Sequence, residues 1–171
     1  MVKKKVAKHA IGLLESFFPN SIIERIVQHT NSYLTKFRKN YSRPRDVRPT
    51  DMVEIKALFE LLYMTDVKKT QHLNVKYLWT SDESGVECMR STMSRKKFLL
   101  LLRALRFDNF EDRAEQKLHD TFAAVTDVLD EFISKCKENY QVGEYSTVDE
   151  MLEPFGGCYK FRQYIPSKPA K

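Results

Sequence analysis

Apolar residues recur at three- and four-residue steps over most of the chain, which is the spacing of one buried helix face. The clearest stretch predicts a helix over residues 21–39, opened by a capping box of Ser21 and Glu24. Its apolar positions are Ile22, Ile23, Ile26, Val27, Tyr33, Leu34 and Phe37. A second helix is predicted to follow a cap at Thr50 or Asp51, and Asp51 has the same capping spacing to Glu54. Its expected buried stripe is Val53, Ala57, Leu58, Leu61 and Leu62.

The middle of the chain continues the helical pattern with short polar breaks. Two short helices are predicted over residues 73–79 and 86–92. Ser94 then caps a strongly apolar helix whose buried positions are Phe98, Leu99, Leu101, Leu102 and Leu105. After a charged loop at residues 109–115, the longest helix is predicted over residues 117–139. Its expected buried side is Phe122, Val125, Leu129, Phe132, Ile133 and Cys136.

The spacing of apolar residues changes from a helical to a strand pattern only near the end of the chain. Residues 145–149 and 158–165 have the pattern of strands, and the Gly156-Gly157 pair between them indicates a turn. The pattern therefore predicts a mainly α fold followed by a terminal β-hairpin.

Positive charge is concentrated in the first fifty residues, which hold 11 Lys and Arg against 3 Asp and Glu, a net charge of +8. The rest of the chain holds 18 against 20, a net charge of −2. Such a concentrated field attracts polyanions, of which nucleic acid is the commonest and an anionic membrane the second. A solvated basic surface or tail is the alternative interpretation.

The composition excludes several classes of protein. The three cysteines, Cys88, Cys136 and Cys158, are widely separated and indicate neither a disulfide framework nor a zinc site. No segment contains the roughly 18 apolar residues that a membrane span requires. With 42% hydrophobic and 30% charged residues, the chain has an ordinary globular composition.

Two basic segments are candidates for contact with DNA phosphates, and such contacts give affinity without reading base sequence. The first is the linker at residues 40–49, where Pro44 and Pro49 prevent a continuous helix. The second is the start of the helix that Ser94 caps. The candidate residues are Arg43, Arg45 and Arg48 in the linker, and Arg95, Lys96 and Lys97 in the helix. A solvated helix face explains the helix residues equally well, and core packing is the expected role of Trp79.

Residues 146–155 (STVDEMLEPF) resemble the opening motif of the catalytic domain of piggyBac transposases, and residues 161–171 (FRQYIPSKPAK) resemble its continuation. Weaker matches fall upstream in the right order, at residues 77–79, 93–95 and 105–108 and at Phe98. The resemblance runs from about Phe17 to the last residue. A helical protein-interaction module without DNA binding is the alternative function.

The resemblance implies a cut-and-paste DNA transposase that inserts at TTAA, with a catalytic core similar to ribonuclease H. In this family three aspartates hold two divalent metal ions, normally Mg²⁺. By its motif, Asp149 corresponds to the first catalytic aspartate and is the expected metal ligand. The implied partners are transposon-end DNA and a second copy in a homodimer, with no membrane, and the implied location is the nucleus.

The expected organisation has three parts: a basic tail at residues 1–20, a helical DNA-binding and dimerisation region at residues 21–140, and the start of a ribonuclease H-like core at residues 141–171. The second and third catalytic aspartates are expected beyond residue 171. This chain alone is therefore expected neither to bind Mg²⁺ stably nor to cleave DNA. The family's basic run after the Pro-Phe pair is replaced here by Gly156-Gly157-Cys158, which is expected to weaken a phosphate contact.

Overall fold

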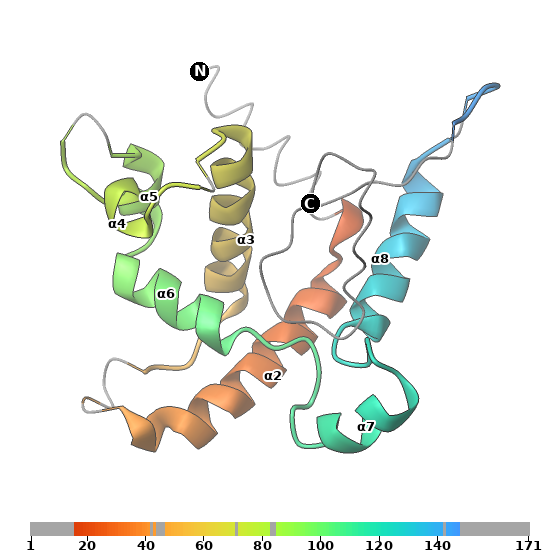
Figure 1. Ribbon diagram of the computed structural model, residues 1–171, viewed down its shortest axis with the longest axis horizontal. Coiled ribbons are helices and arrows are strands. Elements are labelled where there is room, and N and C mark those ends of the chain that lie inside the picture. Colours follow the sequence, from red (N-terminus) through yellow and green to blue (C-terminus); the bar gives the residue numbers. More distant parts are fainter. Residues whose placement is uncertain are drawn as a thin grey trace, which may run out of the picture. The chain divides into compact units, whose positions relative to one another are not determined.

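The computed structural model describes residues 16–147 except residues 42, 44–46, 71, 83–84 and 142, with the backbone alone described at residues 114 and 117 (Figure 1). The chain divides into a first unit, Met1–Asn139, and a second unit, Tyr140–Lys171. The described residues are mainly helical and contain no strand. The helices, in chain order, are α2 (Asn20–Phe37), the 3-10 helix η1 (Arg38–Asn40), α3 (Met52–Val67), α4 (Val75–Leu78), α5 (Glu87–Thr92), α6 (Arg95–Ala104), α7 (Arg113–His119) and α8 (Thr126–Asn139).

The apolar stripe predicted for the first helix is confirmed in α2, which packs on α3 and α6. Ile22, Ile23 and Ile26 are fully buried. The predicted capping box is wrong, because the helix begins one residue earlier, behind Pro19. The φ of Pro19, −59°, already suits a helix start, and the Ser21 hydroxyl donates 3.0 Å to Glu131 Oε1 of α8 instead of capping.

The caps predicted for α3 and α6 are confirmed. Asp51 Oδ1 accepts a hydrogen bond from the Glu54 backbone N–H at 2.8 Å, and Ser94 Oγ accepts one from the Lys97 backbone N–H at 3.3 Å. Each bond satisfies an N–H that the first turn of a helix leaves without a partner.

The stripe predicted for α3 is partly wrong. Val53 is 75% exposed, whereas Ile55, which the pattern missed, is fully buried beside Leu58 and Leu61. Apolar residues occupy most sides of this helix, so their spacing alone does not determine which side faces the core. The packing against α2, α5 and α6 determines it.

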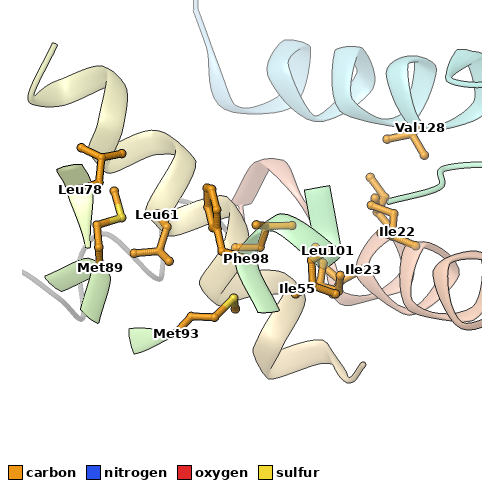
Figure 2. Packing of buried hydrophobic residues seen from close by; sticks show 12 residues of the cluster. Ile22, Ile23, Ile55, Leu61, Leu78, Met89, Met93, Phe98, Leu101 and Val128 are labelled. Atoms are coloured by element: carbon orange, nitrogen blue, oxygen red, sulfur yellow. The ribbon is translucent and has the colours of Figure 1, made fainter. Parts of the chain in front are cut away.

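The main hydrophobic core joins α2, α3, α6 and α8 with the short helices α4 and α5 (Figure 2). Its buried residues are Ile22, Ile23, Ile26, Ile55, Leu58, Leu61, Leu78, Met89, Met93, Phe98, Leu101 and Val128. Trp79 packs against Phe98 with ring centroids 4.8 Å apart, and its Nε1–H donates to the Met93 carbonyl at 2.8 Å. The expectation that Trp79 serves core packing is therefore confirmed.

The long helix predicted over residues 117–139 is wrong, because the chain breaks it into α7 and α8. Asp120 causes the break: its carboxylate accepts from the Phe122 backbone N–H at 2.8 Å and from the Thr126 hydroxyl at 2.5 Å. Local side-chain bonds of this kind compete with the helical backbone pattern. The hydrogen bonds from Thr126 and Phe122 also hold the pKa of Asp120 below its ordinary value. Part of the predicted charged loop, from Arg113 onward, belongs to α7.

The same break changes which residues of α8 are buried. Val128 faces the core near Ile22 (Figure 2), while the predicted core residues Phe122, Leu129 and Ile133 are partly exposed. On the same side of α8, Glu131 pairs with Arg25 of α2 and accepts a hydrogen bond from the Ser21 hydroxyl.

The predicted hairpin falls mostly outside the described residues. Residues 145–147 are described and are not in a strand, and the remaining predicted strand residues lie beyond them. Among the described residues, no helix combines the length and apolar character needed to cross a bilayer.

Candidate nucleic-acid interface

The last residues of the linker are fixed between α2 and α6. Val47 is buried against Leu34 of α2 and Leu100 of α6. The Thr50 backbone makes two hydrogen bonds with the Asn31 side chain: its N–H donates to Oδ1 at 2.7 Å and its carbonyl accepts from Nδ2 at 2.9 Å. The linker backbone is thus anchored on both sides of Arg48.

One carboxylate connects this linker to the first turn of α6. Glu54 Oε1 accepts from Arg48 Nη2 at 2.8 Å, and Glu54 Oε2 lies 2.8 Å from Lys97 Nζ. The Thr50 hydroxyl donates to the same Oε2 at 2.8 Å. Side chains from the linker and from α6 therefore meet at a single residue of α3.

The environment of Glu54 stabilises its charged form. Burial by itself raises the pKa of the carboxyl group, but hydrogen bonds from Lys97 and Thr50 and the charges of Lys97 and Arg48 outweigh it. The net result is a pKa below the ordinary value of 4.5.

This lowered pKa makes the stability of the first unit pH-dependent. A carboxyl group whose pKa is lower in the folded than in the unfolded state contributes stability above the unfolded value and loses it as the pH falls through the folded value. We expect Glu54→Gln to reduce the free energy of unfolding at neutral pH and to have a shrinking effect once the pH falls below 4.5. Urea unfolding of both proteins across this range measures the difference, and a difference that stays constant with pH would contradict the assignment.

The structure joins two of the predicted DNA-binding residues, Arg48 and Lys97, through the carboxylate of Glu54. The Arg48 side chain is 69% exposed, and Arg95 and Lys96 are exposed in the same first turn of α6 as Lys97. We call Arg48, Arg95 and Lys96 the basic surface. The side chain of Lys97 is only 10% exposed and is paired with Glu54, so a phosphate could reach it only by displacing that carboxylate.

The remaining predicted site residues are Arg43, Arg45 and Asp149. Arg43 is exposed in the linker, and Arg45 lies outside the described residues. Asp149 also lies outside them, so its predicted roles in catalysis and Mg²⁺ binding stay predictions. Within the described part of the chain, no three His, Cys, Asp or Glu side chains lie together as a metal site would need.

A further basic residue, Arg106, serves the fold. Its guanidinium lies 3.6 Å from the centroid of the Tyr33 ring, and its backbone N–H donates to the buried Thr30 hydroxyl at 3.2 Å. Sequence reasoning missed this contact and also the role of Glu54. The only signal for Glu54 was its capping distance from Asp51.

Two comparisons with known proteins identify the family. A family profile described as Transposase IS4 matches residues 9–171. The chain is also similar to a cryo-EM structure of a piggyBac transposase synaptic complex with hairpin DNA, with 37% sequence identity and a TM-score of 0.82. That match covers 92% of this chain and 33% of the other, so the chain spans about a third of the length of that transposase. This chain belongs to the piggyBac-type transposase IS4 family.

Proposed function

We propose that this chain is a DNA-binding segment of a piggyBac-type cut-and-paste transposase and that its basic surface contacts duplex phosphates. The observation that carries the proposal is the carboxylate of Glu54, which joins Arg48 of the linker to Lys97 in the first turn of α6, where Arg95 and Lys96 are exposed. The similar piggyBac transposase was solved with hairpin DNA, which supports DNA as the partner here.

Charge and geometry favour phosphate contact over base reading. Arginine presents a planar fork of donors that matches phosphate oxygens, and lysine adds a mobile charge. Each phosphate neutralised in B-DNA releases counterions, so the logarithm of the binding constant falls with the logarithm of the salt concentration by about 0.9 per contact. Binding through the basic surface should therefore be strongest at low salt and largely independent of sequence.

The double substitution Arg95→Ala and Lys96→Ala tests the proposal. We expect it to weaken duplex binding at low salt and to reduce the salt slope by about 2, because two phosphate contacts are lost. Fluorescence anisotropy of a labelled duplex, titrated at several salt concentrations, measures both quantities.

The matched control is Lys76→Ala with Lys137→Ala, which removes two exposed charges from α4 and α8. This control should leave the slope nearly unchanged. Equal effects of the two pairs would indicate general attraction to a positive protein. No binding by the unaltered chain at low salt would favour the alternative of a helical interaction module.

The proposal extends to Asp149 as the first catalytic aspartate of a ribonuclease H-like core and a Mg²⁺ ligand. Its support is the motif around residue 149 and the family match over residues 9–171, in a family that generally uses divalent metal ions. Hard oxygen ligands suit Mg²⁺, and two ions held by carboxylates would clamp the attacking and leaving oxygens of phosphoryl transfer. Backbone chemical shifts of residues 145–149 and 158–165 test the hairpin: helical values would contradict it.

Target choice, assembly and location complete the proposal. Insertion at TTAA, pairing with a second copy, and a nuclear location follow from the family resemblance, and the synaptic complex of the similar transposase supports assembly. Sedimentation with and without DNA tests the pairing: a monomer under both conditions would contradict it. Imaging of a tagged chain tests the location, which exclusion from the nucleus would contradict.

A further inference from the structure

We propose that Glu54 is a positioning residue for DNA binding, which holds Arg48 beside the first turn of α6 so that the basic surface meets DNA as one rigid unit. The proposal rests on the DNA-binding function proposed above. The sequence pattern marks Glu54 only as a capping partner of Asp51, whereas the structure places it between two basic segments.

The contact with Glu54 leaves most of the Arg48 guanidinium available. Arg48 Nη2 donates to Glu54 Oε1 at 2.8 Å, and a guanidinium has five N–H donors in a fixed fork. The side chain remains 69% exposed. Glu54 can therefore fix the direction of the fork while other donors remain free to bind a phosphate.

Glu54 is itself held by groups that Arg48 does not use. Lys97 Nζ lies 2.8 Å from Oε2 and the Thr50 hydroxyl donates to the same oxygen, which leaves Oε1 for Arg48. The ammonium group of Lys97 also compensates the charge of Glu54, so the group of three keeps a positive charge toward DNA. The packing of α3 against α6 therefore places Glu54, and Glu54 in turn orients Arg48.

The backbone around Arg48 is also fixed, by the burial of Val47 and by the two hydrogen bonds between Thr50 and Asn31. Association normally loses free energy when a long side chain must be ordered on binding. Both the backbone and the side chain of Arg48 are ordered before DNA binds. Removal of the Glu54 carboxylate should therefore weaken DNA binding even though the arginine itself is kept.

A double-mutant cycle tests whether Glu54 acts through Arg48. The full chain and its variants Arg48→Ala, Glu54→Gln and the double variant are titrated with a labelled duplex at several salt concentrations. Glu54→Gln is expected to weaken binding by about 3–10-fold and to lower the salt slope toward that of Arg48→Ala. In the Arg48→Ala background it should cause no further loss.

Two further variants separate positioning from folding. Glu131→Gln removes a carboxylate that pairs with Arg25 elsewhere in the first unit, and it should leave DNA binding unchanged. Glu54→Gln combined with Lys97→Met removes the ion pair without leaving an unpaired buried ammonium group. It should stay folded by circular dichroism and show the same loss of binding as Glu54→Gln alone.

Three results would overturn the proposal: unchanged binding by Glu54→Gln, an equal loss in the Arg48→Ala background, or tighter binding, which would make Glu54 a competitor of phosphate. Failure of the proposed DNA-binding function gives results that differ from these three. In that case the unaltered chain does not bind duplex DNA, or the Arg95→Ala and Lys96→Ala pair leaves binding unchanged.

Discussion

Replacing Phe98 with alanine is expected to lower the free energy of unfolding of the first unit by about 3–5 kcal/mol, the usual loss for a large buried aromatic residue. Phe98 is 2% exposed and lies in the main core with Leu61 and Leu101 (Figure 2). Its ring also packs on Trp79. The substitution removes the contact of α6 with Trp79, the residue that follows α4, and leaves a cavity that rigid helices can fill only in part.

Chemical denaturation followed by circular dichroism measures this loss. Leu102→Ala is the matched control, because it shortens a side chain of the same helix that is 38% exposed. Surface changes of this kind usually alter stability by about 0.5 kcal/mol or less. Equal effects at the two positions would contradict the burial of Phe98.

Gly85→Ala is expected to destabilise the first unit by about 1–3 kcal/mol or more, the range for forcing extra volume into a packed site. A Cβ at this position would lie 2.0 Å from the Thr80 carbonyl oxygen and 2.9 Å from the carbonyl carbon. Both atoms belong to the backbone, so relief requires the turn between α4 and α5 to move. That movement would disturb the hydrogen bond from Val86 N–H to the Leu78 carbonyl, 3.2 Å long.

The same substitution at Gly143 is the control for Gly85. A Cβ there would meet only the Tyr145 carbonyl oxygen, at 4.0 Å, which is ordinary contact. Gly143→Ala should therefore leave the thermal unfolding midpoint nearly unchanged, whereas Gly85→Ala should lower it. Similar midpoints for the two variants would show that the approach of Gly85 to Thr80 is not close.

Much of the helical fold follows from local sequence signals. The stripe of α2 is readable because polar residues separate Ile22, Ile23 and Ile26 from Leu34 at helical spacing. The caps Asp51 and Ser94 act on their own helices, so their spacing is sufficient to predict them.

The errors arise where distant or competing contacts decide. Val53 and Ile55 cannot be ranked by spacing in a helix that is apolar on most sides, and only packing places Ile55 inside. The break between α7 and α8 depends on hydrogen bonds of Asp120 in a stretch without glycine or proline. The apolar spacing runs unchanged through Asp120, so the spacing alone predicts one continuous helix.

In the candidate interface, too, some features follow from the local sequence and others depend on distant contacts. The sequence identifies the basic residues, because charge is visible without structure. It does not show that Arg48 and Lys97 share the carboxylate of Glu54, since that meeting depends on the packing of α3 and α6. The sequence predicts that Lys97 contacts DNA, and it does not show that the Lys97 side chain is largely buried in an ion pair; the contact itself stays a prediction.

The central claim is that duplex DNA binds through Arg48 and the first turn of α6. A titration of the isotope-labelled chain with a short duplex, followed by amide chemical shifts, tests it most directly. We expect the shifts to change at residues 47–50 and 94–97 and to stay nearly constant along α8. Changes confined to α8, or no changes at low salt, would contradict it.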